Sequence, residues 1–502
     1  MQSTKQRVRL NLQRYNARLI FFPTRNLLLT MKKLLCCLLL SFAPFAMGDG
    51  IPDLGDVSQS TLSTVQERQI GLQTMLQIRA SKQFFDDPEV NDYLNRLGDR
   101  LVEKSPEPSQ QFEFFCINDN RINAFAVPGG FVGVNIGLLL LTQSESELAS
   151  VLGHEIAHVT QHHYARLLNG TQGDGLAVMA AMAVAILAAR SNPQVAQATA
   201  ATAQASALQK QLDFTRTHEQ EADRIGLTLL QQSGFSIHAM PQFLERMQQS
   251  TRLLEGNAPN YLRTHPITSS RIADVENRVE KYPFQLIPDS IDFQLMRAKL
   301  LLTQKTNNDA LSYFNGALYG TQKFGNPIAQ RYGLVLSLLR SRNPERATQE
   351  MATLQQQLPH HPMIVTLAGQ VLRATQPTKA LAFYKTALAD FPQYRALVYD
   401  YADLLLQSNQ SEQSVRLVTE QITRYPNDVK LYTLQVRGYA QLGKRLEQHQ
   451  AQAYAFYGQG NLRGTIQQLE LAREAGGNFQ QLSMIESDLR ELRDMLAAQP
   501  KK

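Results

Sequence analysis

The stretch His154-Glu155-Ile156-Ala157-His158 places two histidines four residues apart, with a glutamate directly after the first. On a helix, positions i and i+4 share one face, so both imidazoles can reach one zinc ion. Glu155 projects about 100 degrees further round the helix, where it can act as general base on a zinc-bound water. The motif predicts metal ligands at His154 and His158 and a catalytic Glu155. The alternative is a surface helix with incidental histidines.

The residues before this motif predict the local structure that carries it. Ser144 and Glu147 suggest a capping box, in which each side chain bonds the other's backbone amide, so a helix is expected to begin there. Short strands are predicted at residues 112–117, 123–127 and 131–134. Pro128-Gly129-Gly130 suits an edge strand or a tight hairpin. A small sheet is therefore expected directly ahead of the catalytic helix.

The histidines that follow the motif do not supply the third ligand that catalytic zinc normally takes. Gln161 and Tyr164 stand where a metzincin would need a glycine and a histidine, which excludes that class. Helical rise places His162 about 12 Å from His154 along the axis, too far to share its metal. His162 and His163 are therefore predicted to be surface residues.

A second helix offers a better third ligand. Glu219 and Asp223 are again i and i+4, so one face carries a carboxylate ligand and a second carboxylate one turn on. Asp223 can hold a zinc-bound histidine by its far nitrogen and fix its tautomer. Periodicity alone does not separate Glu219 from Glu221. Arg216 and Arg224 are candidates for stabilising the oxyanion.

Residues 219–226 resemble the ligand helix of the M48 metalloproteases, which has the form Glu-x-x-x-Asp. The resemblance implies one Zn²⁺ per chain, with Glu219 rather than Glu221 as third ligand and Asp223 orienting a histidine. A second resemblance is to the family's pre-catalytic edge strand, which can pair with an extended substrate backbone. The matching residues are Asn123, Ala124, Phe125, Ala126 and Val127.

Thr264-His265-Pro266, followed by Arg271, resembles the family's His-Pro segment. In relatives with a repeat domain, the matching histidine can approach the zinc from the side where water should sit. The resemblance therefore implies that His265 is a regulatory or fourth ligand that keeps the protease closed until a substrate arrives. The alternative is an exposed loop histidine beside a helix start.

Residues 1–48 form a targeting segment rather than a basic binding surface. They hold eight Lys and Arg and no acidic residue, and removing these eight from the chain's 50 basic residues leaves 42 against 44 acidic ones. The basic balance therefore does not indicate nucleic-acid binding. From Met31, Lys32 and Lys33 precede an apolar run over 34–45 and a small-residue cleavage site at 46–48, as in a signal peptide. The alternative is a single membrane anchor.

An apolar stretch and a set of repeats follow the motifs. Residues 176–189 are apolar throughout but too few to span a membrane comfortably, so a buried helical hairpin is expected, with lipid contact or a mobile lid as alternatives. From about residue 290 the chain repeats at intervals of 33 and 34 residues, in a pattern that resembles the tetratricopeptide repeat. The positions in register are Ala347, Ala380 and Ser414, and the prolines Pro359, Pro392 and Pro426.

Together these patterns predict a mainly α fold with a small β-sheet in a gluzincin-type catalytic domain over 49–283. An all-α tetratricopeptide-repeat solenoid over 290–502 is predicted to contact partner proteins, or to serve only as a scaffold. The resemblance implies a periplasmic zinc endopeptidase in outer-membrane protein quality control, acting on misassembled outer-membrane proteins and reaching the assembly machinery through the repeats. One alternative is a repeat-based chaperone or adaptor with a latent or self-inhibited zinc site. The other, an integral membrane protease, is weakened because no segment of 49–502 is long enough to span a bilayer.

Overall fold

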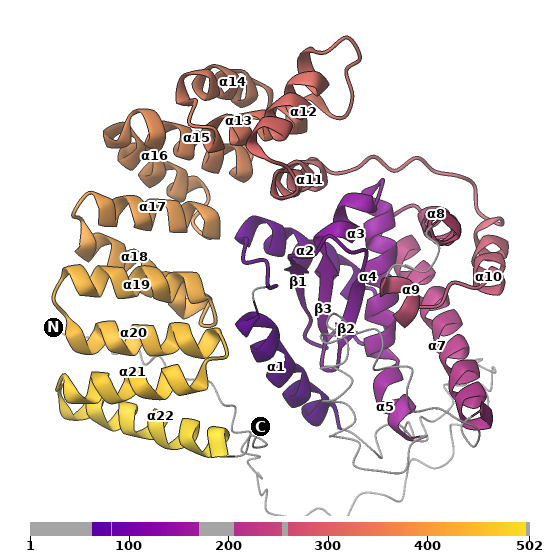
Figure 1. Ribbon diagram of the computed structural model, residues 1–502, viewed down its shortest axis with the longest axis horizontal. Coiled ribbons are helices and arrows are strands. Elements are labelled where there is room, and N and C mark those ends of the chain that lie inside the picture. The colour runs from indigo at the N-terminus through magenta and orange to yellow at the C-terminus, as the bar shows by residue number, and fades with distance from the viewer. Residues whose placement is uncertain (1–62, 82, 170–204, 254–259, 498–502) are drawn as a thin grey trace, which may run out of the picture. The chain divides into compact units, whose positions relative to one another are not determined.

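The computed structural model describes residues 63–81, 83–169, 205–253 and 260–497, so the segments 1–48 and 176–189 lie outside the described residues. The predicted fold class, mainly α with one small sheet, is confirmed (Figure 1). Among the described helices, none combines the length and the apolarity needed to cross a membrane. The helices before the repeats are α1 (Thr64–Ala80), α2 (Pro88–Val102), α3 (Ile136–Leu141), α4 (Glu145–Thr160), α5 (His163–Asn169), α7 (Ala205–Gln232), α8 (Ala239–Leu253), α9 (Asn260–Thr264) and α10 (Ser269–Val279).

The three predicted strands are present as β1 (Glu113–Ile117), β2 (Ala124–Val127) and β3 (Phe131–Asn135). Their order in the sheet is β1-β3-β2, with β1 parallel and β2 antiparallel to β3, so β2 is an edge strand. Gly129 and Gly130 join β2 to β3 with φ of 80° and 89°, backbone conformations that favour glycine. The Pro-Gly-Gly sequence therefore makes a tight hairpin.

The two faces of the sheet pack on different helices. Met75 and Ile78 of α1 cover the face formed by Phe115, Ile117, Phe125, Val127 and Phe131. The other face packs on α2 and α4 through Phe114, Cys116, Ala124, Ala126, Val132 and Val134. Alternate strand residues thus enter opposite layers, as the period of two requires.

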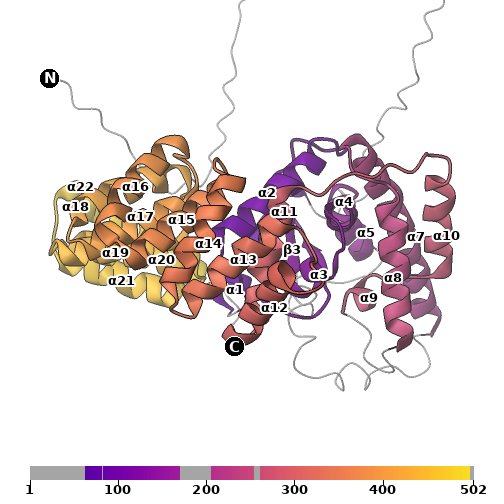
Figure 2. The ribbon, with the colours of Figure 1, turned by 90° about the horizontal axis from the view of Figure 1, so that it is seen from above.

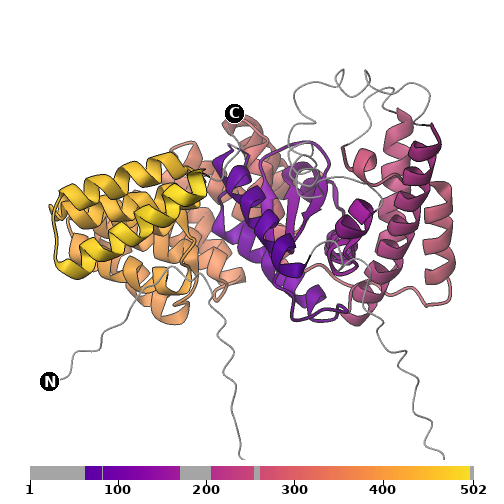
Figure 3. The same ribbon diagram turned by 90° about the horizontal axis from the view of Figure 1, so that it is seen from below.

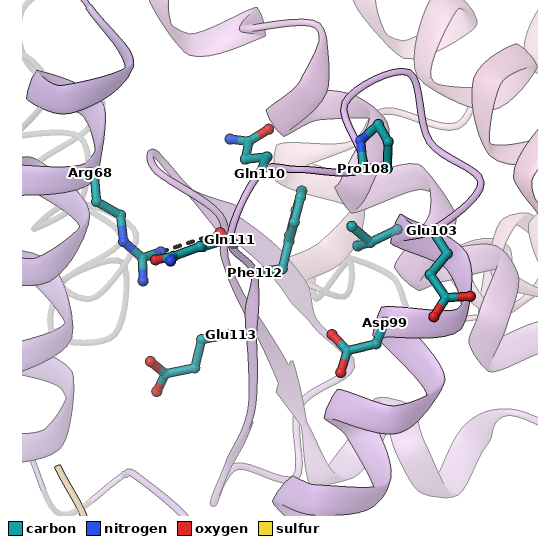
Figure 4. Close-up of a pocket in the computed structure, with 9 residues that line it drawn as sticks. Arg68, Asp99, Glu103, Pro108, Gln110, Gln111, Phe112 and Glu113 are labelled. Carbon is teal, nitrogen blue, oxygen red and sulfur yellow. Dashed lines mark hydrogen bonds between the residues drawn. The ribbon is translucent and has the colours of Figure 1, made fainter. Parts of the chain in front are cut away.

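Arg68 of α1 anchors the hairpin end of the sheet (Figure 4). Its guanidinium donates to the carbonyls of Gln111 and Gly129 and lies 4.1 Å from the ring centroid of Phe131. Arg68 also lines an open pocket of ≈ 540 Å³ beside α2 and β1. None of the candidate zinc ligands lines this pocket. The contacts of Arg68 with Gln111, Gly129 and Phe131 fix the sheet on α1.

Helices α4 and α7 cross at two glycines. A Cβ on Gly226 would lie 3.2 Å from the backbone nitrogen of His154, and a Cβ on Gly153 would lie 3.4 Å from the carbonyl oxygen of Gly226. The absence of side chains at both positions lets the two backbones approach closely. Helix α10 packs on both α7 and α8, and α8 also packs on α4 (Figures 1 and 2). The crossing sets the face of α7 that meets the catalytic helix.

The predicted cap of α4 is only half formed. Ser144 accepts a hydrogen bond from the backbone amide of Glu147, as expected. The Glu147 carboxylate does not return to the Ser144 amide; it accepts from the amide of Gln143 and pairs with Arg246. The Glu147 carboxylate therefore pairs with a basic side chain on α8 and with the preceding amide instead of closing the capping box.

The repeats form a continuous helical array. The elements are α11 (Ile291–Thr303), α12 (Asn307–Tyr319), α13 (Pro327–Arg340), α14 (Pro344–Gln357), α15 (Pro362–Thr375), α16 (Pro377–Asp390), α17 (Arg395–Gln407), α18 (Ser411–Arg424), α19 (Val429–Gln441), α20 (Arg445–Gly458), α21 (Leu462–Glu474) and α22 (Phe479–Ala497). Ala347, Ala380 and Ser414 are fully buried, each at the fourth position of its helix. Figure 3 shows the last pair, α21 and α22, side by side. The predicted repeat solenoid is confirmed.

Helix α11 belongs to two cores at once. Phe293 and Met296 are buried with the residues that surround the sheet, whereas Leu295 and Leu302 are buried with the first repeats. Lys299 on the same helix reaches the buried Glu89 of α2, 2.6 Å away. A helix that is apolar on both sides therefore joins the sheet-containing part of the chain to the repeats.

Candidate metal centre

Four side chains from three segments of the chain converge on one point. His154 and His158 come from α4, Glu219 from α7, and His265 directly follows α9. One ligand atom from each lies within 4.8 Å of the others, and all four residues are buried. Within the described residues this is the cluster of His, Cys, Asp and Glu that could hold a metal ion. The structure thus brings together the three predicted ligands and the predicted regulatory histidine.

The spacing of the donors fits tetrahedral zinc. Nε2 of His154 lies 3.0 Å from Nε2 of His158, 3.2 Å from Nδ1 of His265 and 3.3 Å from Oε2 of Glu219. Zinc with bonds of about 2.0–2.1 Å to nitrogen and oxygen needs tetrahedral donors about 3.3–3.4 Å apart. Two or three imidazoles and a carboxylate are also the donor types that zinc prefers. The donor types and the distances between them therefore both fit a zinc ion.

Asp223 holds His154 from the side away from the cluster. Its Oδ1 lies 3.0 Å from Nδ1 of His154, which leaves Nε2 directed at the other donors. Burial disfavours the ionised carboxyl, but the charge of Arg271 and the bonds to His154 and Arg271 outweigh it and lower the pKa of Asp223 to about 2. The predicted role of Asp223, to orient a histidine, is compatible with this contact.

The sequence pointed to Arg271 only as the residue that follows the His-Pro segment. In the structure it contacts both Asp223 and Glu219. Its guanidinium donates two bonds of 2.7 Å to Asp223, lies 2.7 Å from Oε2 of Glu219 and donates to the carbonyl of Pro266. Burial opposes the charge on Glu219, yet His265 and Arg271 hold its pKa well below its usual range. The carboxylate is thus ionised, as a metal ligand must be.

Glu155 lies beside the donors without being one of them. It is 1% exposed, and its Oε1 has no hydrogen-bond partner among the described residues. Nε2 of His265 lies 3.3 Å from that oxygen. A buried acceptor next to a metal site is suited to bind and deprotonate a water there.

His265 is buried, so the alternative of an exposed loop histidine is wrong. Its Nδ1 lies 3.1 Å from Oε1 of Glu219, and its ring packs 4.9 Å from that of Tyr261 in α9. The backbone amide of Tyr261 donates to the carbonyl of Ile122, two residues before β2. The segment that carries His265 is therefore hydrogen-bonded to the loop that leads into the edge strand.

The prediction that His162 and His163 are surface residues is wrong, since they are 7% and 4% exposed. Helix α4 ends at Thr160, and His162 takes a left-handed φ of 49°, which turns the chain back. His162 then bonds Glu67 and lies 3.4 Å from Glu107; the bond to Glu67 raises its pKa to about 9. His162 is not among the donors, as predicted from its spacing, but the surface prediction failed because the chain turns back at the end of the helix.

The other predicted residues lie around the cluster. Ala124 and Ala126 of the edge strand β2 are buried, and the hydroxyl of Tyr164 donates to the carbonyl of Ala126 at 2.7 Å.

Arg216 is exposed, and Arg224 pairs with Asp274 on α10, so Arg224 is directed away from the donors. The predicted oxyanion role of Arg224 therefore finds no support in its contacts. Glu221 lies outside the donor cluster and pairs with His163 and Arg166.

The catalytic helix, the carboxylate on a second helix and the repeat array together define a metallopeptidase of the His-Glu-x-x-His class with tetratricopeptide repeats. Residues 88–279 match the description "Peptidase family M48", and residues 371–437 match a tetratricopeptide-repeat family. The chain is 32% identical over 428 residues to the Beta-barrel assembly-enhancing protease of Escherichia coli (strain K12), covering 84% of this chain and 87% of that protein. The chain belongs to peptidase family M48.

Two further relatives show how far the similarity extends. The Beta-barrel assembly-enhancing protease of Yersinia pestis is 31% identical over 421 residues, covering 83% of this chain and 86% of that protein. Mitochondrial metalloendopeptidase OMA1 of Schizosaccharomyces pombe is 33% identical over 184 residues, covering 37% of this chain and 51% of that protein. The similarity to the bacterial proteases thus includes the repeats, and the similarity to OMA1 covers a shorter part. The predicted metalloendopeptidase activity is confirmed by family membership.

Proposed function

We propose that this chain is a zinc-dependent endopeptidase of the Gram-negative periplasm. It degrades misassembled or stalled outer-membrane proteins and assists the assembly of productive ones. The observation that carries the zinc assignment is the spacing of 3.0–3.3 Å between the donors of His154 and those of His158, His265 and Glu219. The names of the full-length bacterial relatives support the role in outer-membrane assembly. In this proposal, residues 1–48 direct export, 49–283 form the peptidase and 290–502 bind the assembly machinery.

The proposed chemistry is divided between the ion and five residues. His154, His158 and Glu219 would hold the zinc, which would supply Lewis acidity to the reaction. Glu155 takes the proton from the water and passes it to the leaving amine. Asp223 holds His154 in the tautomer whose Nε2 faces the cluster, so it acts by positioning rather than by contact with the substrate.

The substrate is proposed to bind as an extended strand along β2. Residues Ala124 and Ala126 turn their backbone groups away from β3, because Asn123 and Asn135 form a hydrogen-bonded pair and the pattern alternates. An extended chain segment can add to this edge, where it would share or replace the bond that the Ala126 carbonyl accepts from the Tyr164 hydroxyl. Only unfolded or unpaired substrate segments offer free backbone groups for such pairing, which fits stalled precursors better than folded barrels.

The test uses residues 49–502 and an outer-membrane β-barrel protein. The barrel protein is presented either diluted from urea or folded in detergent micelles. We expect cleavage of the unfolded form only, loss of cleavage with a chelator and recovery with added zinc. Cleavage that a chelator leaves unchanged would refute the zinc assignment. Equal cleavage of both forms would refute the proposed substrate class.

A second candidate function rests on the position of His265. With His265, four protein donors surround the proposed zinc, and four donors are typical of closed, structural sites. This arrangement favours a repeat-based chaperone or adaptor whose zinc site is self-inhibited. In the proposed protease, His265 is instead a latch that leaves when a substrate enters.

Replacing His265 decides between the two. In His265→Ala the fourth position is free for water, so basal cleavage of the unfolded protein should rise. The open state of such an equilibrium is about 0.1–10% populated, so the expected rise is about 10-fold or more. His360→Ala, at an exposed position after α14, is the control and should leave cleavage unchanged. Unchanged cleavage in His265→Ala would show that His265 is not a latch.

A further inference from the structure

His158 has a contact that neither its spacing nor the proposed mechanism explains. Its Nε2 faces the donor cluster, 3.3 Å from Oε1 of Glu219. Its other ring nitrogen, Nδ1, lies 2.8 Å from Nδ1 of His163, and the two rings are nearly perpendicular at 76°. A metal-ligating histidine needs a partner at its second nitrogen, and here that partner is another imidazole.

The hydrogen-bonding chemistry of the pair fixes both tautomers. If Nε2 of His158 presents its lone pair to a metal, the proton of that ring is on Nδ1 and must be donated. His163 must then accept with an unprotonated Nδ1, so its own proton is on Nε2. That nitrogen lies 3.2 Å from Oε2 of Glu221, which accepts it. Arg166 also donates to Oε2 of Glu221 and holds the carboxylate in place.

The surroundings hold the His163 ring in place. The ring is 4% exposed and stacks on His218 with the centroids 4.2 Å apart and the planes 3° from parallel. The stacking fixes the plane of the ring. The left-handed turn at His162 is what returns the His163 side chain to the end of α4.

We propose that His163 is a positioning residue that orients His158 and fixes its tautomer for zinc, with Glu221 fixing the tautomer of His163 in turn. The proposed site then has two orienting systems of different chemistry. His154 is held by the ionised Asp223 of α7, and His158 is held by the neutral His163 of α5. This inference rests on the proposed zinc site and goes beyond it by assigning two residues that no motif explained.

The test compares two polar replacements that differ in where they place an acceptor. In His163→Asn the side-chain oxygen takes about the position of ring Nδ1 and can accept from His158. In His163→Gln the longer side chain places its amide near the position of Nε2 and leaves His158 without a partner. Loss of such a partner typically weakens metal binding by about 10–100-fold. We expect that loss in His163→Gln and in His163→Ala, and near-wild-type affinity in His163→Asn.

The readouts are independent of proteolysis. They are the zinc dissociation constant of residues 49–502 from competition with a chelator, and the visible spectrum of the Co²⁺-substituted protein, which reports ligand geometry. His162→Asn is the matched control, because asparagine tolerates the left-handed backbone and leaves the His158 contact intact.

Glu221→Ala should weaken zinc binding less than His163→Gln. Equal affinity and spectra in wild type, His163→Gln and His163→Asn would overturn the proposal, as would tighter binding by His163→Gln than by His163→Asn. Failure of the wild type to bind zinc would instead refute the proposed zinc site.

Discussion

Glu155→Gln is expected to lower the rate of cleavage of an unfolded substrate by about 10²–10⁴-fold, the range that general-base catalysis supplies. Glu155 is buried beside the donor cluster, and its Oε1 has no hydrogen-bond partner among the described residues. Glutamine has nearly the same shape but accepts no proton at neutral pH. The measurement is kcat/KM for one unfolded substrate, with wild type and variant at equal protein concentration.

Bound zinc must be quantified in both proteins. Because Glu155 does not belong to the donor cluster, the variant should bind zinc in the same amount as wild type. Loss of activity at equal zinc content assigns Glu155 to the chemical step. Retained activity in a fully loaded variant would rule out its proposed role as general base. Loss of zinc along with activity would show that Glu155 supports the site structurally.

Arg271→Gln is expected to reduce the free energy of unfolding of the zinc-free protein by about 3–5 kcal/mol, the usual cost of breaking a buried ion pair. Arg271 is 2% exposed and is bonded to both Asp223 and Glu219. Its removal leaves the buried carboxylates of Asp223 and Glu219 with only histidine side chains as charged partners. The measurement is urea unfolding at neutral pH in the presence of a chelator, so that metal binding contributes nothing.

The same two helices provide the control. In the buried pair, Asp223 of α7 binds Arg271 of α10. In a second, more exposed pair the charges are exchanged, because α7 supplies Arg224 and α10 supplies Asp274. Arg224→Gln should change the free energy of unfolding by less than about 1 kcal/mol, as for other surface pairs. Equal losses in the two variants would show that burial does not govern the Arg271 contact.

The pH dependence of the Arg271 effect has a definite sign. The pKa of Asp223 falls from about 3.9 in unfolded chains to about 2 on folding. A carboxyl with a lowered pKa contributes its full stabilisation above its unfolded pKa and loses it as the pH falls through the folded one. The difference between wild type and Arg271→Gln should therefore be complete above about pH 4 and shrink toward pH 2. A difference that grows as the pH falls would contradict this account.

Features that depend on short-range periodicity were predictable. The i, i+4 spacing of His154 and His158 fixes their common face on any helix, and strand alternation with Pro128-Gly129-Gly130 fixes the hairpin. The repeat interval is likewise local, because each copy buries a small residue, alanine or serine, at the fourth position of its helix. These predictions required no knowledge of which elements meet.

Where the chain bends was not predictable from the same patterns. The helical spacing from His154 placed His162 and His163 on the surface, whereas the helix ends at Thr160 and the left-handed His162 returns His163 to His158. Arg271 was missed as a structural residue because its two carboxylate partners lie 48 and 52 residues before it in the sequence. The Glu-x-x-x-Asp spacing gives no sign of that arginine.

The sequence by itself determined the chemistry that is present: two histidines and a glutamate on one helix, two carboxylates on another and a histidine in a His-Pro segment. The tertiary structure decided which of these groups meet. Glu219 and Glu221 are two residues apart and point to different sides of α7, and the crossing at Gly153 and Gly226 turns Glu219 toward the histidines. His265 joins the cluster across 111 residues of sequence, and packing over such separations leaves no periodic trace in the chain.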